Sequence, residues 1–205
     1  MGSVHPGVPK DLLLQLTAKY PVEHFIETGT LLGDTAAWAA EHFAHVVTIE
    51  ADATHHARAA QRFAGNSRIE VILGASHQVL PNLLPKLTGR AVFWLDGHWS
   101  GEGTAGEDCE CPVLDEIAAI YRWGAGHVVL VDDARMFMAP PKPPHKMEAW
   151  PDLAEVAAAL AAVSPRPYVG LVEDVIFAIP GELRAVVGSY VHRAPPAKRG
   201  FFRRA

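Results

Sequence analysis

The strongest limit on the fold of this chain is the alternation of short apolar runs with longer amphipathic stretches. The expected strands are Val22–Glu27, Val46–Glu50, Ile69–Leu73, Ala91–Asp96 and His127–Asp132. The expected helices between them are Gly33–Phe43, Ala53–Phe63, Ser76–Lys86 and Pro112–Trp123, where polar residues recur at helical spacing. This β-α-β-α order predicts a parallel sheet with helices on both faces, because each return to the sheet requires a crossover helix.

The end of the chain departs from this alternation. Tyr168–Val172 and Val175–Ile179 are strand-like runs separated by two acidic residues, which predicts an antiparallel hairpin. Two further helices are expected, Asp11–Tyr20 before the first strand and Pro151–Val163 before the hairpin. The predicted fold is therefore α/β, a doubly wound and mostly parallel sheet of seven strands with a C-terminal antiparallel hairpin.

Length and composition indicate one globular domain over residues 1–205. The chain has 49% hydrophobic and 20% charged residues, which excludes wholesale disorder. Its formal net charge of −5 argues against nucleic acid as a general partner, since nucleic-acid-binding domains are basic. The one basic cluster falls in residues 194–205 and is interpreted as a solvated tail.

The compartment is predicted from what the sequence lacks. No apolar run approaches the roughly 18 residues of a membrane span, and the start has no signal-peptide pattern. Cys109 and Cys111 are too close together for a relaxed disulfide, so a cytoplasmic protein with no membrane partner is expected. A zinc site at Asp108–Pro112 is disfavoured because no second pair of ligands exists. A homodimer is left open.

The first expected strand runs into the segment Glu27–Thr35, which contains two glycines four residues apart. Gly29 and Gly33 would let the backbone approach a ligand closely, at a helix start that Asp34 and Thr35 can cap. Glu27 at the strand tip could accept a hydrogen bond from an ammonium group or a water. The alternative is a plain turn and helix cap. A nicotinamide dehydrogenase would instead require Gly-x-Gly-x-x-Gly here.

The next two strand ends extend this pattern. Glu50 ends the second strand about twenty residues after the glycine turn, where an acidic side chain can hold ribose hydroxyls. Gly74-Ala75-Ser76 ends the third strand, and Ser76 is either a helix N-cap or a neighbour of an adenine ring. Together these residues predict a nucleoside cofactor.

Carboxylates follow the fourth and fifth expected strands. Asp96 and His98 come after one, and Asp132, Asp133 and Arg135 after the next. Carboxylates that meet at one edge of a sheet repel one another unless a cation, a proton or Arg135 offsets them. Oxygen ligands favour Mg²⁺ or a similar divalent ion. The alternative is that Asp132 or Asp133 caps the next segment while Asp96 binds the cofactor alone.

These motifs resemble a known family over roughly residues 20–180. The glycine turn, Asp96 and the Asp132-Asp133 pair resemble the metal-dependent O-methyltransferases typified by catechol O-methyltransferase. The segments 95–101 and 132–135 resemble more closely a group of small bacterial class I methyltransferases. The resemblance implies a Rossmann-like methyltransferase domain that binds S-adenosylmethionine.

Site residues follow from the resemblance. The implied metal ligands are Asp96, Asp132 and Asp133. The implied cofactor-binding residues are Glu27, Thr28, Gly29, Thr30, Gly33, Thr35, Glu50, Ala75, Ser76, Asp96 and Trp99.

Two departures from the catechol-type pattern affect the chemistry. Ser100 stands where that family has a lysine base, and Asp133 stands where it has an asparagine ligand. His98 is the candidate replacement base, since a neutral imidazole accepts a proton near pH 7. Its alternatives are a metal ligand or a partner that orients Asp96. Trp99 is expected in a pocket wall.

The loops are expected to cover this edge of the sheet. Residues 99–111 form a predicted lid, and residues 139–145 are a stiff proline-rich loop. The expected function is O-methylation of a small molecule assisted by a divalent metal, with His98 and Asp96 as catalytic residues. Metal-free methylation, with the aspartates binding an amine or orienting Arg135 toward a carboxylate, is an alternative. A non-catalytic nucleoside-binding protein of the same fold is another.

Overall fold

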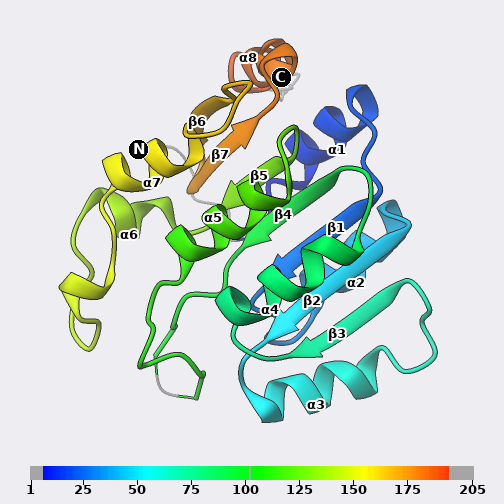
Figure 1. Ribbon diagram of the computed structural model, residues 1–205, viewed down its shortest axis with the longest axis vertical. Coiled ribbons are helices and arrows are strands. Elements are labelled where there is room, and N and C mark those ends of the chain that lie inside the picture. The colour runs from blue at the N-terminus through cyan, green and yellow to red at the C-terminus, as the bar shows by residue number, and fades with distance from the viewer. Residues whose placement is uncertain (1–6, 102, 194–205) are drawn as a thin grey trace, which may run out of the picture.

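The computed structural model describes residues 7–101 and 103–193, so the predicted basic tail 194–205 lies outside the described residues. Seven strands form one sheet in the order β3-β2-β1-β4-β5-β7-β6 (Figure 1). Their bounds are β1 His24–Thr28, β2 His45–Glu50, β3 Ile69–Leu73, β4 Ala91–Leu95, β5 Val128–Val131, β6 Tyr168–Val172 and β7 Val175–Ile179. All seven predicted strands are present, within a residue or two at each end.

Strand pairing confirms the predicted fold class. β1 lies between β2 and β4 and is parallel to both, and the parallel pairing continues to β3 on one side and β5 on the other. β7 is antiparallel to β5 and forms a hairpin with β6. The sheet is therefore mostly parallel, doubly wound and closed by an antiparallel hairpin.

Helices connect the strands. Their bounds are α1 Lys10–Lys19, α2 Asp34–His42, α3 Ala53–Arg62, α4 Ser76–Leu83, α5 Val113–Trp123, α6 Ala134–Met138, α7 Leu153–Leu160 and α8 Arg184–Val191. α6 and α8 were not predicted. The expected helix to Lys86 ends earlier as an α-helix and continues as a short 3₁₀ turn, since Pro85 has no N–H for the α-helical ladder.

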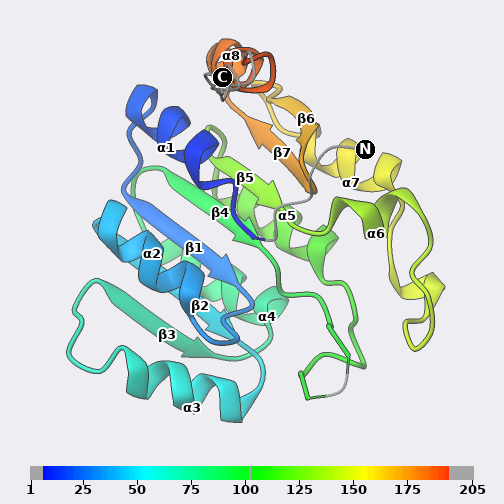
Figure 2. The same cartoon turned by 180° about the vertical axis from the view of Figure 1, so that it is seen from behind.

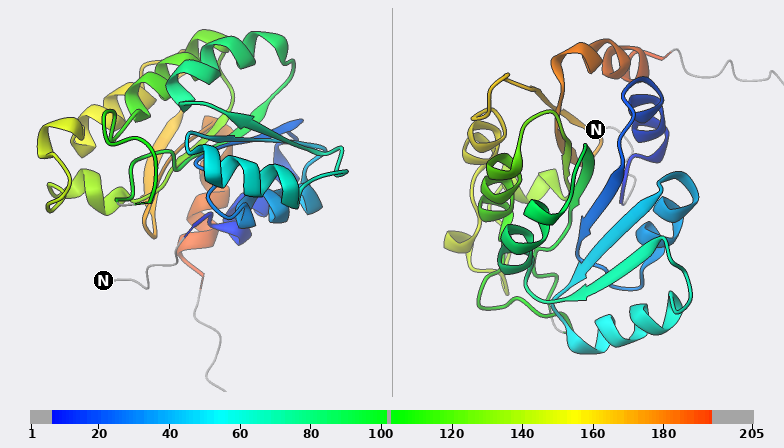
Figure 3. Two further views of the ribbon diagram at one scale, coloured as in Figure 1. Left: turned by 90° about the horizontal axis from the view of Figure 1, so that it is seen from below. Right: turned by 45° about the vertical axis from the view of Figure 1, so that its right-hand side comes forward.

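Two helical layers cover the sheet, with α4, α5 and α7 on one face and α1, α2 and α8 on the other (Figures 2 and 3). On the α5 side, Ile26, Phe93 and Ile117 are fully buried. Phe25 and Trp94 point to the α2 side, into the second core. The central strands are thus buried on both faces, which explains why they read as continuous apolar runs. Of the helices in residues 7–101 and 103–193, none has the length and hydrophobicity of a membrane span.

Candidate functional site

The site lies where the strand order reverses. The chain passes from β1 to α2 on one face of the sheet and from β4 to α5 on the other, so the carboxyl ends of β1 and β4 open a crevice. A cavity of about 210 Å³ occupies this position. It is lined by Gly29, Leu31, Ile49, Glu50, Ala51, His55, Gly74, Ser76, Asp96, Gly97, His98, Ser100, Thr104 and Ala105.

The glycine turn forms one wall of the cavity. Gly29 has φ +84°, and a side chain there would overlap the backbone carbonyl of Asp96. Gly33 has φ +79° and immediately precedes α2. Both positions favour glycine, since a side chain at Gly33 would meet the Phe63 ring. At Gly29 the β1 turn and the β4 turn meet backbone to backbone.

Glu50 braces this turn. Its Oε2 accepts hydrogen bonds from the backbone N–H groups of Thr30 (3.1 Å) and Leu31 (2.8 Å). Its Oε1 accepts from the backbone N–H of Asp52 at 2.9 Å. A carboxylate offers about four acceptor positions, so Glu50 can also accept from a ligand in the cavity that it lines.

Glu27 lies one residue before the end of strand β1 and does not line the cavity. Its Oε2 accepts a hydrogen bond from the Thr48 hydroxyl at 2.6 Å. Burial raises the pKa of Glu27 to about 8, with the nearby Asp96 adding to the shift. Burial thus favours the neutral form of the Glu27 side chain, and its predicted contact with the cofactor stays a prediction.

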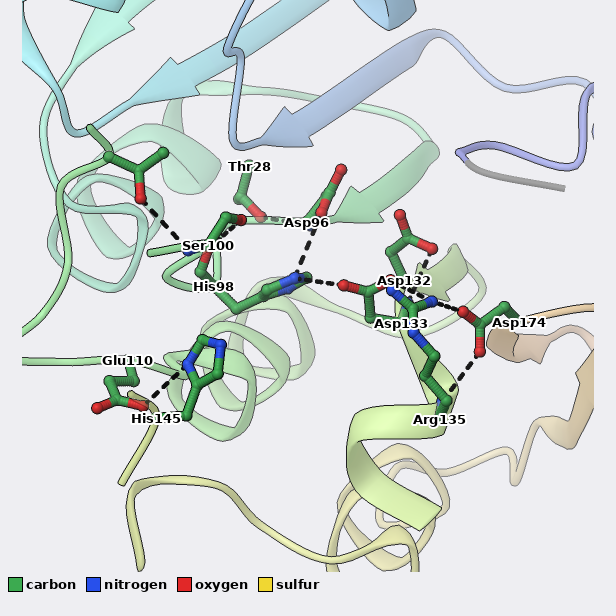
Figure 4. A network of polar contacts seen from close by, with 11 residues as sticks. Thr28, Asp96, His98, Ser100, Glu110, Asp132, Asp133, Arg135, His145 and Asp174 are labelled. Atoms are coloured by element: carbon green, nitrogen blue, oxygen red, sulfur yellow. Dashed lines mark hydrogen bonds and ion pairs between the residues drawn. The ribbon is translucent and has the colours of Figure 1, made fainter. Parts of the chain in front are cut away.

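Asp96, His98 and Asp133 converge at the carboxyl ends of β4 and β5 (Figure 4). His98 Nε2 lies 2.8 Å from Asp133 Oδ2 and 3.8 Å from Asp96 Oδ1. Asp133 has φ 56°, and this left-handed conformation begins α6 directly after β5. The histidine is thus held between two carboxylates, with its ring in the cavity wall.

Arg135 closes the far side of the cluster. Arg135 pairs with Asp133 at 2.7 Å and also with Asp174. The backbone N–H of Arg135 donates to Asp174 Oδ1 at 2.9 Å. Asp174 lies in the turn of the β6–β7 hairpin, and its sequence position predicts a turn residue only.

The pKa values of the three aspartates in this cluster are shifted by different amounts and in different directions. Burial raises the pKa of Asp96 to about 7, and the charge of Asp132 adds to the shift. Burial raises the pKa of Asp132 to about 6. Burial would also raise the pKa of Asp133, but its hydrogen bond to His98 and the charges of His98 and Arg135 outweigh this and lower it. For His98, burial alone would lower the pKa, yet the hydrogen bond to Asp133 and the nearby carboxylates raise it.

This arrangement does not fit three-carboxylate metal coordination. One oxygen of Asp133 faces His98 and the other faces Arg135, so both oxygens already have cationic or N–H partners. Within residues 7–101 and 103–193, no group of three or more His, Cys, Asp or Glu side chains is placed to hold a metal ion. The predicted metal site at Asp96, Asp132 and Asp133 has no geometric support and stays a prediction.

Loop 99–111 is attached to residues 145–150 by contacts that the sequence did not predict. Glu110 is buried and accepts from Trp150 Nε1 at 3.0 Å and from the backbone N–H of Lys146. Trp99 is buried, with its ring edge-on to His145, and is not part of the cavity wall. His55 of α3, which lines the cavity, contacts the carbonyl of Gly103 at 3.1 Å.

The predicted cofactor residues divide into three sets. Gly29, Glu50, Ser76 and Asp96 line the cavity, together with the predicted base His98. Ala75 lines an adjoining groove. The remaining predicted residues do not line the cavity: Glu27, Thr28, Thr30, Gly33, Thr35 and Trp99.

Sequence comparison gives no relatives. A scan against protein-family models finds no match, and a search of curated proteins finds none.

Comparison with solved structures gives clear fold matches at low identity. One is a Staphylococcus aureus protein provisionally assigned as a caffeoyl-CoA O-methyltransferase, with a TM-score of 0.58, 16% identity and coverage of 87% of this chain and 86% of that one. A Podospora anserina methyltransferase bound to SAH has a TM-score of 0.56, 17% identity and coverage of 85% and 79%. A SAM-dependent methyltransferase from Aquifex aeolicus has a TM-score of 0.51, 14% identity and coverage of 83% and 88%. The chain has the fold of class I methyltransferases.

Proposed function

We propose that this class I methyltransferase fold binds S-adenosylmethionine and methylates a hydroxyl group of a small molecule. The observation that carries the proposal is the cavity at the carboxyl ends of β1 to β4. Four residues predicted to bind the cofactor line it, one at or just after the carboxyl end of each of the strands β1 to β4: Gly29, Glu50, Ser76 and Asp96. Ligands of doubly wound sheets bind at this crevice.

The residues that line the cavity suit a nucleoside ligand. Glu50 has acceptor capacity left for ribose hydroxyls, and Ser76 and Ile49 border the same cavity. S-adenosylmethionine, when bound, supplies an electrophilic methyl group on a sulfonium centre. The protein's main contribution is then to hold the acceptor oxygen in line with that group.

His98 is the proposed general base. His98 lines the cavity, and its Nε2 faces Asp133, so Nδ1 is the nitrogen that takes the acceptor's proton. The Asp133 carboxylate then stabilises the imidazolium that forms. Arg135 and Asp174 fix the position of Asp133 from the far side. The catechol-type family has a lysine base where this sequence has Ser100. The Asp133–His98 pair takes the place of that base.

Metal-assisted methylation is the second candidate, and it rests on the resemblance alone. Since Asp133 is engaged by His98 and Arg135, we expect turnover to persist in excess EDTA. Loss of turnover in EDTA, with recovery on addition of Mg²⁺, would establish the metal mechanism instead.

Calorimetry of the whole chain tests the proposal, with S-adenosylmethionine, S-adenosylhomocysteine and NAD as separate ligands. We expect binding of the first two and none of NAD. Binding of NAD alone, or of no nucleoside ligand, would refute the proposed function. Production of S-adenosylhomocysteine with a panel of small alcohols, phenols and amines then distinguishes O-methylation from N-methylation and from binding without catalysis.

A further inference from the structure

Glu116 is a buried acid directly behind the cavity, and the proposed chemistry gives it no role. It lies in the first turn of α5 and is 1% exposed. Burial raises the pKa of Glu116 and outweighs the hydroxyls of Ser76 and Thr28, which lower it. Among the described residues, its Oε1 has no hydrogen-bond partner.

The surroundings of this carboxyl connect it to three turns of the site. Ser76 follows β3 and lines the cavity. The Thr28 hydroxyl, at the end of β1, accepts a hydrogen bond from the backbone N–H of Asp96 at 3.2 Å. Gly97, after β4, lies so close that a side chain there would be 3.3 Å from Glu116 Oε1.

Stability does not explain an acid at this place. Acidic residues favour the first turn of a helix because of the helix dipole, but the neighbouring Asp115 is exposed and already supplies that charge. A buried polar oxygen without a partner destabilises the fold, and an apolar residue of similar volume would avoid that cost. Costs of this kind are retained mostly where a site requires them.

We propose that Glu116 is a positioning residue for the cofactor: its buried, unpartnered carboxyl accepts from the Ser76 and Thr28 hydroxyls when the cofactor binds, and so holds the turns after β1, β3 and β4 at the spacing that the adenosine half requires. The inference rests on the proposed function, because the cavity is taken to be the S-adenosylmethionine site. Glu116 acts through Ser76, Thr28 and Gly97, and does not itself line the cavity.

The test compares an apolar and an isosteric variant by calorimetry with S-adenosylmethionine and by thermal unfolding. Glu116→Leu should weaken cofactor binding about tenfold while its Tm stays within about 3 °C of the unmodified protein. Glu116→Gln keeps a donor and an acceptor in the same volume, so its Kd should stay within about threefold. The control Asp115→Asn, one residue away and exposed, should change neither quantity.

A double-mutant cycle separates positioning from a general structural effect. If Glu116 acts through Ser76, the losses of affinity in Glu116→Leu and Ser76→Ala are not additive, and the double variant binds more tightly than their product predicts. Additive losses would overturn the proposal, as would wild-type affinity in Glu116→Leu or equal losses in the Leu and Gln variants. Should the Leu variant not fold, Glu116→Met, with its more adaptable side chain, takes its place under the same thresholds. Failure of the unmodified protein to bind S-adenosylmethionine would refute the proposed function and is a distinct outcome.

Discussion

Replacing Glu50 by glutamine separates its two roles, as brace of the glycine turn and as ribose acceptor. In the structure one carboxylate accepts three backbone N–H groups, those of Thr30, Leu31 and Asp52. An amide has a single oxygen. If that oxygen serves Thr30 and Leu31, the amide NH₂ faces the N–H of Asp52 and that bond is lost.

The expected loss of stability follows from this count. Hydrogen bonds to a charged acceptor contribute about 1.5–3 kcal/mol each, and neutral ones about 0.5–1.5 kcal/mol. One bond is lost and two become neutral, but the turn borders a cavity, where water compensates part of the loss. These values add up to about 3.5–6 kcal/mol before water compensates, so Glu50→Gln should lower the free energy of unfolding by about 3 kcal/mol.

Urea unfolding measures this change as a lower midpoint with an unchanged m-value. Glu70→Gln is the matched control, since Glu70 is exposed on the adjacent strand β3 and its substitution should cost less than about 0.5 kcal/mol. A loss below about 0.5 kcal/mol in Glu50→Gln would refute the brace. Weaker S-adenosylmethionine binding with unchanged stability would leave only the ribose role.

Three further changes have expected outcomes. Gly29→Ala should abolish cofactor binding and destabilise the fold by at least about 2 kcal/mol, because Gly29 has φ +84° and the new methyl group would overlap the Asp96 carbonyl. Calorimetry measures the binding and urea unfolding the stability, and normal binding would contradict the prediction. Burial lowers the pKa of His127 to about 4, and its Nδ1 accepts from the Ala91 N–H, so the unfolded chain takes up this proton first on acidification. Stability should fall by about 2–3 kcal/mol between pH 6.5 and 4, and His127→Phe should flatten that part of a urea-midpoint profile; an unchanged slope would contradict the assignment. His98→Asn should lower kcat about a hundredfold with cofactor affinity within about twofold, and full turnover would remove His98 as the base.

The architecture was predictable because it depends on short-range patterns in the sequence. Continuous apolar runs identify the central strands, and helical spacing identifies the crossovers. Parallel strands place their carboxyl ends at one edge, which is why Gly29, Glu50 and Asp96 could be expected together. α6 and α8 were missed, and α6, with five residues, is too short for its periodicity to be recognised.

Side-chain partnership was decided by the tertiary structure. Asp133 could have been a metal ligand or a helix cap, but the β6–β7 hairpin brings Asp174 to Arg135, and Arg135 pairs with Asp133. Trp99, expected in a pocket wall, is buried beside His145, which lies 46 residues further along. From the sequence Glu116 is an ordinary first-turn acid, and only the fold brings its Oε1 close to Gly97 in the cavity wall.

The sequence by itself therefore determined the order of strands and helices and the edge of the sheet where polar residues collect. Both depend on the backbone preferences and hydrophobic spacing of neighbouring residues. Only the packed structure decided which charge faces which, because an ion pair or a buried acid depends on a few ångströms between segments distant in the chain. At those separations a small change in packing alters solvation and Coulomb energy by more than any local preference.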